Sequence, residues 1–225
     1  MQKHGRNYII IVIMAYFPMF IEIENKNCLV VGGGAVALRK VLVLLDFGAK
    51  VHVVAPQILP EICALEGQGL RLSPRPFCEE DLKGCLLAVT ATDDTDMNHR
   101  VAECAKKAGI AVNAVDQKED CSFIFPSYVR QQNLVGAFSS GGSSPILAQY
   151  LKKEMAGILN PELGNANEYL GSIRERVKDE VATEAARKKV YQEVLARLLS
   201  DIGEGGDGRG ISDEELEGLI KEVIQ

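Results

Sequence analysis

The sequence predicts an α/β protein in which a parallel sheet is followed by a β-rich segment and a C-terminal helical domain. Apolar runs of strand length alternate with helical patterns over the first half of the chain. The apolar run at 27–31 stops abruptly at Gly32, Gly33 and Gly34, and a helical pattern begins directly after them. Strands that alternate with helices imply a parallel sheet covered on both faces. After Asp116 the pattern changes to β-rich and then long helical segments.

The strands of the sheet are expected at 27–31, 50–54, 85–91 and 110–115. A weaker strand at 70–74 is expected at an edge, because it contains a proline. A helix is expected from about 94 to 108, with Gly109 as its stop signal. Ligands of such sheets bind at the carboxyl ends of the strands. Three stretches end there, at 32–34, 92–94 and 116–117.

The second half of the chain has a different organisation. β-rich residues at 121–129 and 134–139 lie either side of the polar stretch 130–133, which predicts an extended hairpin. A helix follows with Ser144 as its N-cap and Pro145 at its first position. One long charged helix, or two, is expected over 167–200, then a glycine-rich link at 203–208 and a last helix from about Ser212. The predicted division is an N-terminal extension at 1–15, a nucleotide-binding domain at 16–116, a dimerisation segment at 117–145 and a helical domain at 146–225.

The glycine turn has the features of a pyrophosphate-binding turn. Gly32, Gly34 and Ala37 match the pattern G-x-G-x-x-A. Glycine lets the backbone turn sharply and approach the phosphates, and the N–H groups at the helix N-terminus face the anion. The strand at 50–54 follows at the distance that a βαβ unit requires, so we predict a Rossmann-like dinucleotide-binding domain. The alternative is a strand-to-helix turn that binds no ligand.

One part of the usual dinucleotide fingerprint is missing. A carboxylate normally ends the second strand and binds the ribose hydroxyl. Here that strand runs into Ala55, Pro56 and Gln57, and no cluster of arginines is present to bind a 2′-phosphate. These residues leave the choice between NAD and NADP open.

Composition excludes several classes of partner. The net charge of −6 and the pI near 5.2 argue against nucleic acid or an anionic membrane as the main partner. An anionic ligand must therefore be bound by local basic groups. The six cysteines are scattered without a C-x-x-C pair, which favours reduced thiols in a cytoplasmic protein. The three histidines are far apart, and we expect no metal site.

The N-terminus carries an apolar run at 8–14 after Lys3 and Arg6, as a signal peptide would. The run is too short to span a bilayer, and no A-x-A-like cleavage site follows it. We interpret Met14 as the natural start and the preceding residues as an upstream extension. N-terminal sequencing of the native protein tests this interpretation, and a mature chain that begins at Met1 would contradict it.

Taken together, the motifs resemble the precorrin-2 dehydrogenase and sirohydrochlorin ferrochelatase family, the N-terminal module of siroheme synthases. The resemblance covers about residues 16–200. The matching segments are FPMF at 17–20, VGGGAVALRK at 31–40, ATDD at 91–94, NAVD at 113–116, SFIFPS at 122–127 and SSGGSSP at 139–145.

The resemblance implies NAD-dependent oxidation of precorrin-2, a reduced tetrapyrrole with eight carboxylates, to sirohydrochlorin. In this family an aspartate at the position of Asp116 is associated with catalysis. Oxidation removes a hydride and a proton from the substrate, and a carboxylate just past a strand end can accept the proton. The alternative is that Asp116 only caps a turn. The family also includes ferrochelatases, so insertion of Fe²⁺ or Co²⁺ into sirohydrochlorin stays open as a second activity.

The remaining site residues fall into two groups. We expect the cofactor to be bound by Gly32, Gly34, Ala35, Val36, Pro56, Gln57, Thr92 and Asp93. Asp94 has the competing role of a helix N-cap. The substrate is expected at Ser139, Ser140, Gly141 and Gly142, because hydroxyls and flexible N–H groups at a helix N-terminus suit a carboxylate. An ordinary capped helix start is the alternative there.

The hairpin also predicts a homodimer. Its apolar residues have no obvious partner in the nucleotide-binding domain, so they would otherwise be exposed. They are Phe123, Ile124, Phe125, Tyr128 and Val129. The interface is expected to use 117–140 and the helices beyond it. The competing function is a non-catalytic NAD-binding regulatory module, as in ion transport systems, but such modules usually keep the acidic residue after the second strand.

Overall fold

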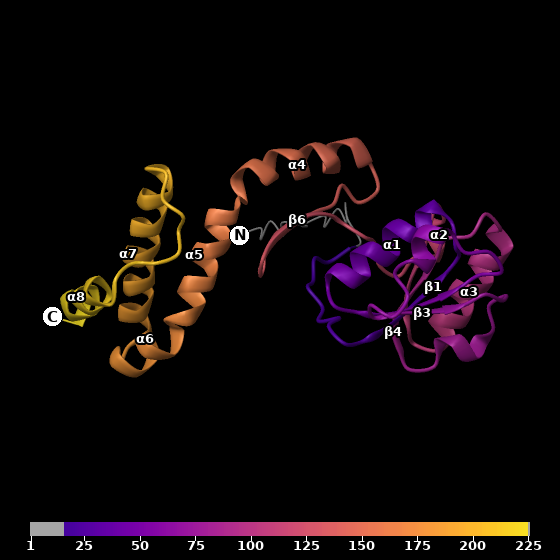
Figure 1. Ribbon diagram of the computed structural model, residues 1–225, viewed down its shortest axis with the longest axis horizontal. Helices are drawn as coiled ribbons and strands as arrows, with labels where there is room; N and C mark the ends of the chain where they lie inside the picture. Colours follow the sequence, from indigo (N-terminus) through magenta and orange to yellow (C-terminus); the bar gives the residue numbers. More distant parts are fainter. Residues whose placement is uncertain (1–15, 225) are drawn as a thin grey trace, which may run out of the picture. The chain divides into compact units, whose positions relative to one another are not determined.

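The computed structural model describes residues 16–224, and the chain divides into two compact units, Met1–Phe125 and Pro126–Gln225 (Figure 1). The expectations for the extension at 1–15, including Met14 as the start, lie outside the described residues. No helix in the described part of the chain is both long and apolar enough to cross a membrane.

The first unit contains the predicted parallel sheet. Its strands are β1 (Asn27–Val31), β2 (Lys50–Val54), β3 (Leu70–Ser73), β4 (Cys85–Thr90) and β5 (Ala111–Ala114). They lie in the order β3-β2-β1-β4-β5, and every pairing is parallel. The edge position expected for 70–74 is confirmed. Because the strand order reverses between β1 and β4, the ligand crevice of such a sheet lies at the carboxyl ends of these two strands.

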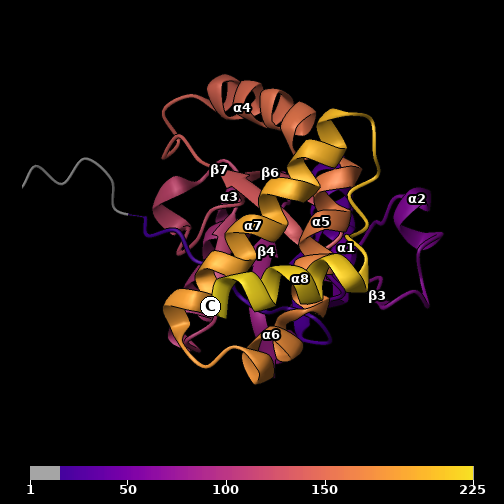
Figure 2. The ribbon, with the colours of Figure 1, turned by 90° about the vertical axis from the view of Figure 1, so that its left-hand side faces the viewer.

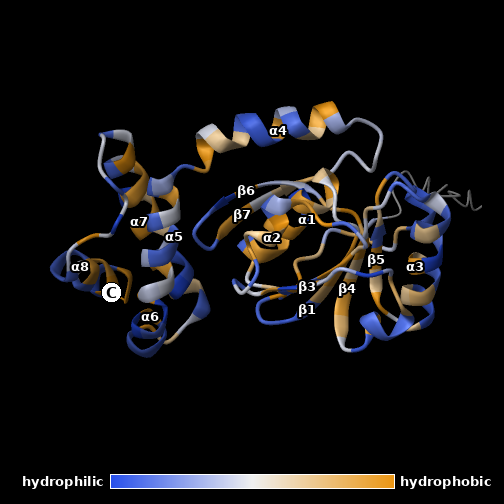
Figure 3. Ribbon diagram, turned by 45° about the vertical axis from the view of Figure 1, so that its right-hand side comes forward, coloured by the Kyte–Doolittle hydropathy of each residue, from blue (hydrophilic) through white to orange (hydrophobic). Residues whose placement is uncertain are grey.

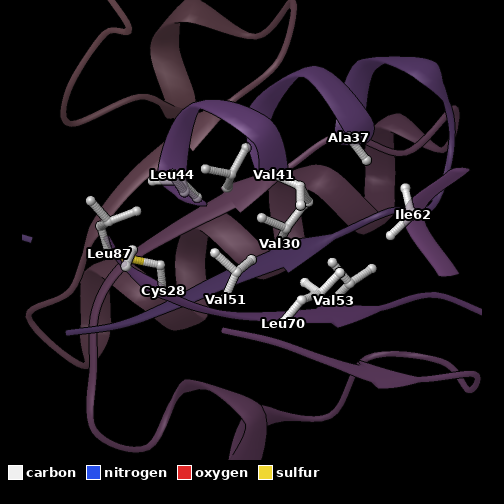
Figure 4. Close-up of a cluster of buried hydrophobic side chains, with 12 residues drawn as sticks. Cys28, Val30, Ala37, Val41, Leu44, Val51, Val53, Ile62, Leu70 and Leu87 are labelled. Atoms are coloured by element: carbon white, nitrogen blue, oxygen red, sulfur yellow. The ribbon is translucent and has the colours of Figure 1, made fainter. Parts of the chain in front are cut away.

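Helices cover both faces of the sheet. The unit contains α1 (Ala35–Asp46), the short α2 (Pro60–Cys63), α3 (Thr95–Lys107) and two 3₁₀ turns, η1 (Glu79–Leu82) and η2 (Lys118–Asp120). One core lies between the sheet and α1 (Figure 4), and the other contains the apolar face of α3. Hydrophobic residues run along the strands, as expected for strands buried on both faces (Figure 3). Burial raises the pKa of the Cys28 thiol to about 12, and all six cysteines are free.

The segment 121–125 is not a strand, so the hairpin prediction was wrong there. Ser122 pairs with the edge strand β5, since its N–H donates to Val112 O at 2.8 Å and its hydroxyl accepts from Val112 N at 2.7 Å. Phe123 and Phe125 pack on the core beneath α1, with ring centroids 5.3 Å apart. These two rings therefore have a partner in the first unit, which corrects the expectation that they have none there.

The second unit begins with a shorter hairpin than expected. Strands β6 (Ser127–Gln131) and β7 (Leu134–Phe138) are antiparallel, with Gln132 in the left-handed conformation at the turn. The turn was expected at 130–133, but Arg130 and Gln131 continue β6. Helix α4 (Pro145–Ile158) follows and packs on the hairpin. Ser144 caps α4 as predicted, because its Oγ accepts from Leu147 N at 3.2 Å.

Four further helices form the rest of the second unit. They are α5 (Pro161–Ser172), α6 (Arg174–Glu180), α7 (Glu184–Gly203) and α8 (Asp213–Ile224), and their apolar faces share one core in which α8 lies against α7 (Figure 2). One or two helices were expected over 167–200, but breaks follow Ser172 and Glu180. The second break is held by Arg187, which donates to Val181 O and Ala182 O at 2.7 and 3.2 Å. The last helix starts where Ser212 predicted it.

A histidine–carboxylate pair joins α3 to η2 and predicts a pH dependence of stability. His99 Nδ1 lies 2.9 Å from Asp120 Oδ2, and Lys106 Nζ lies 3.6 Å from Asp120 Oδ1. The hydrogen bond with Asp120 and the charge of that carboxylate raise the pKa of His99, Glu103 adds to the rise, and Lys106 opposes it. The folded state therefore binds the proton of His99 more tightly than the unfolded state does.

We expect this pair to stabilise the fold at low pH. Since the folded pKa is raised, its contribution is fully present below the unfolded pKa near 6.5 and is lost as the pH rises through the folded pKa. Denaturant unfolding at about pH 6 and about pH 8 measures the difference. The variant His99→Gln should lose this part of the pH dependence, and an identical pH profile for variant and wild type would contradict the assignment.

Candidate functional site

The first glycine of the turn is required by both conformation and space. Gly32 follows β1 with φ +127°, a conformation that side chains rarely adopt. A Cβ there would lie 2.3 Å from Ala91 O, the carbonyl that follows β4. The N–H of Gly32 donates to Val54 O at 3.0 Å. Gly32 therefore joins the ends of the three central strands without room for a side chain.

Gly33 is a site residue that the sequence analysis missed. A Cβ at Gly33 would lie 2.1 Å from Gln57 O, and Gly33 O accepts from Leu59 N at 2.9 Å. The pattern G-x-G-x-x-A leaves this position undefined, so only the run of three glycines pointed to it. The contact brings Pro56 and Gln57, two predicted cofactor residues, next to the glycine turn.

Gly34 leaves the N-terminus of α1 open. It is the N-cap of the helix, with φ −89°, and no side chain caps the helix there. A Cβ at this position would meet nothing within 4 Å. The helix then starts with Ala35 and Val36, whose N–H groups belong to the first turn and have no partner within the helix. Free N–H groups, the positive end of the helix dipole and open space together suit a phosphate, so this turn fits the pyrophosphate of a dinucleotide.

The turn after β4 is held by a buried asparagine. Asn98 of α3 accepts from Thr92 N at 3.2 Å and from Thr92 Oγ1 at 2.8 Å, and it donates to Thr92 O at 2.9 Å. Its Oδ1 also accepts a short hydrogen bond from Thr90 Oγ1. Asp94 caps α3 by accepting from Asp96 N and Met97 N, while Asp93 is exposed. Asn98 was not predicted as a site residue, although it fixes the turn expected to border the cofactor.

Asp116 follows β5 in an unusual backbone conformation. Asp116 has a φ of +62°, and the residue is exposed. The Cys121 thiol closes the loop around it, since it donates to Ala114 O at 3.1 Å and to Gln117 O at 3.4 Å and accepts from Ala114 N at 3.3 Å. Non-glycine residues are uncommon in this region, but aspartate is among those that adopt it most readily, and Asp116 lies in a turn.

The turns after β4 and β5 are joined directly. Gln117 Nε2 donates to Thr95 O at 3.1 Å, and Val115 N donates to Thr90 O at 3.0 Å. β1, β4 and β5 are neighbours in the parallel sheet, so their carboxyl ends form one edge of it. The glycine turn, the Thr92 turn and Asp116 lie along this carboxyl edge. The structure therefore brings together every predicted cofactor residue and the predicted catalytic residue.

The serine–glycine segment before α4 belongs to the second unit. Ser139 Oγ accepts from Gly141 N at 3.0 Å, and Ser140 Oγ accepts from Ser144 N at 3.0 Å. Gly141 and Gly142 have positive φ values of +63° and +86°. The two hydroxyls thus shape the loop that leads into the helix, which is the role that the capped-helix alternative described.

The described residues contain no group of three or more His, Cys, Asp or Glu side chains that could hold a metal ion. A cavity of about 620 Å³ lies at the opposite, amino end of β4 and is lined by Glu79, Leu82, Cys85 and Cys104 among others. It is separate from the edge that carries the glycine turn.

Comparison with known proteins shows which enzymes the chain resembles. It is 39% identical over 214 residues to the siroheme synthases of Shigella sonnei (strain Ss046) and Escherichia coli (strain SE11), a match that covers 94% of this chain. The chain is similar to part of the siroheme synthases. It spans about half the length of these curated relatives, 46% in both cases. The resemblance drawn from the sequence motifs is confirmed.

Two further matches agree with this relationship. Residues 19–127 match the model of a family described as putative NAD(P)-binding. The solved structure of "SirC, precorrin-2 dehydrogenase" has a TM-score of 0.72 and 23% sequence identity, and the match covers 93% of this chain and 99% of that one. This likeness confirms the predicted fold class. The family match and the open glycine turn support a nicotinamide dinucleotide, NAD or NADP, as the cofactor.

Proposed function

We propose that this chain oxidises precorrin-2 to sirohydrochlorin with NAD, as a step of siroheme synthesis. The observation that carries the proposal is the single edge at which the glycine turn, the Thr92 turn and Asp116 meet. It combines a place for a dinucleotide with an exposed carboxylate beside it. The homology to the siroheme synthases supplies the substrate class.

The roles of the cofactor residues follow from their positions. Gly32 and Gly34 let the pyrophosphate approach the N-terminus of α1, where Ala35 and Val36 present their N–H groups. Pro56, Gln57, Thr92 and Asp93 border the same edge from β2 and β4. Ala55, Pro56 and Gln57 after β2 supply neither a cation for a 2′-phosphate nor a carboxylate for the ribose hydroxyl, so the choice of NAD is part of the proposal and is tested below against NADP. When bound, NAD supplies a hydride acceptor.

Asp116 is proposed as the base. Removal of a hydride from the substrate leaves a proton to be released, and an exposed carboxylate can accept it. The Cys121 thiol restrains the loop, so the carboxylate is held at the edge without a large loss of freedom upon binding. The segment Ser139 to Gly142 is proposed to bind substrate carboxylates at the N-terminus of α4.

The test is an assay with precorrin-2 and NAD⁺ followed by absorbance, with NADP⁺ as the comparison and Fe²⁺ or Co²⁺ added after oxidation. Oxidation with preference for NAD⁺ is the expected result, and the metal addition measures chelation as a separate activity. Binding of the dinucleotide without any oxidation would contradict the proposal and favour the regulatory-module alternative.

The free cysteines are consistent with a protein that functions in the reducing cytoplasm.

We also propose that the protein is a homodimer. Although Phe123 and Phe125 are covered within the first unit, helix α4 exposes apolar side chains of similar size. They recur along the helix and are Ile146, Leu147, Tyr150, Leu151 and Ile158. Exposed apolar side chains along one face of a helix are typical of an interface, and a second copy of the chain is the partner that the proposal names.

Light scattering at micromolar concentration should therefore give the mass of a dimer. The variant Ile146→Glu, at a residue that is 80% exposed, should shift the equilibrium to monomer because a charge is then buried in the interface. Lys153→Glu on the same helix is a charge-changing control. A monomeric mass for the wild type would refute the proposal.

A further inference from the structure

Lys40 contacts the segment that follows Asp116 in the chain and has no role in the function described so far. It belongs to α1, the helix that begins at the glycine turn, and its residue is partly buried. Its Nζ lies 3.9 Å from the centroid of the Phe125 ring. Phe125 comes from the segment after β5 that packs on the core beneath α1. The ammonium group is thus held between α1 and the residues that follow Asp116.

The pKa of Lys40 reflects both its burial and the charges around it. Burial, and then the neighbouring charge of Arg39, lower the pKa of Lys40, whereas Cys121 and Asp116 act in the opposite direction. Asp116 has the smallest of these influences. Among residues 16–224, no carboxylate forms an ion pair with Lys40.

The contact with Phe125 restrains the ammonium without neutralising it. An aromatic face attracts a cation, but it uses none of the N–H donors in a conventional hydrogen bond. A lysine that is already partly desolvated and ordered loses less hydration and less side-chain freedom when an anion binds. These properties suit a cation that binds an anionic ligand, and they are unlike those of the exposed neighbour Arg39.

The proposed substrate needs such a cation. It carries several carboxylates, the chain has a net charge of −6, and Asp116 itself repels an anion that approaches it. We propose that Lys40 binds a carboxylate of the tetrapyrrole substrate beside Asp116. The inference rests on the proposed function, and it assigns to α1 a second task, since one end of the helix faces the pyrophosphate and Lys40 faces the substrate.

The experiment compares two neutral variants of adjacent residues in the full-length protein. Lys40→Met keeps an unbranched apolar side chain against Phe125 and removes the charge. Arg39→Met makes the same change of charge one residue away, at an exposed position. Lys40→Met should raise the KM for precorrin-2 by about 10- to 100-fold, the range for loss of a hydrogen bond to a charged group. Its kcat and its KM for NAD⁺ should stay close to those of the wild type.

Two further measurements separate binding from a structural role. Lys40→Arg keeps a cation that stacks on an aromatic ring, so it should restore most of the affinity for precorrin-2. The KM of the wild type for precorrin-2 should rise with salt more steeply than that of Lys40→Met, because the variant lacks one ion pair with the substrate.

Equal KM values for Lys40→Met and Arg39→Met in an active protein would overturn the role of Lys40 alone. Equal losses in kcat, in NAD⁺ affinity and in melting temperature would also overturn it, because they indicate a packing role. A wild type that binds NAD⁺ but does not oxidise precorrin-2 would overturn the proposed function and this inference with it.

Discussion

Replacement of Asp116 by alanine is expected to reduce the rate of dehydrogenation by roughly 10²–10⁴-fold, the effect of losing a positioned acid–base group. The carboxylate follows β5, whereas the glycine turn that faces the cofactor follows β1, so the affinity for NAD⁺ should be almost unchanged. Steady-state kinetics with precorrin-2 and calorimetry with NAD⁺ measure the two quantities. Because Asp116 has a positive φ, the melting temperature must be recorded as well.

Asp116→Asn is the matched variant. Asparagine tolerates the left-handed conformation and keeps the shape of the side chain, so it tests the charge separately from the backbone. Loss of activity in both variants supports a base. Activity retained by asparagine and lost by alanine would mean that the residue positions the substrate by hydrogen bonding. If the protein also inserts Fe²⁺ or Co²⁺, both variants should lose that activity when the carboxylate serves both reactions. Full dehydrogenase activity in Asp116→Ala would overturn the assignment.

Gly34→Asp should abolish detectable binding of NAD⁺ while the protein stays folded. Two unit charges about 4 Å apart repel each other by about 4 kcal/mol near a protein surface, roughly a thousandfold in affinity. The fold should tolerate the change, since φ is −89° and a Cβ would meet nothing within 4 Å. Aspartate is also a favoured N-cap residue, so the melting temperature should be unchanged or higher. Calorimetry and thermal unfolding of the same sample test both statements.

Two variants serve as controls for Gly34→Asp. Gly34→Asn is a similar N-cap without the charge, so it should retain more affinity for NAD⁺ than the aspartate variant does. Gly32→Ala, in contrast, should destabilise the domain itself, because its Cβ would lie 2.3 Å from Ala91 O. Unchanged NAD⁺ affinity in Gly34→Asp would show that the pyrophosphate does not approach this helix end.

The local signals of the sequence predicted most of the first unit. Alternation of apolar runs with helical patterns was sufficient for the five parallel strands, and the predicted edge position of β3 is confirmed, although Pro74 lies just after the strand. Asp94, Ser144 and Gly109 marked helix ends correctly because capping depends on residues adjacent in the chain. The glycine turn was found for the same reason, as its conformation and its chemistry both lie within a few residues.

Contacts between residues far apart in the chain decided the rest. Gly33 against Gln57, Asn98 on Thr92 and the thiol of Cys121 around Asp116 all depend on which strand ends meet. The segment 121–125 has the composition of a strand, yet Phe123 and Phe125 gain more by burial under α1 than they would in an exposed hairpin. The sequence by itself therefore determined the sheet, the glycine turn and the candidate base. Only the tertiary structure placed the ammonium of Lys40 over the ring of Phe125, because contacts between separate elements have no local signal.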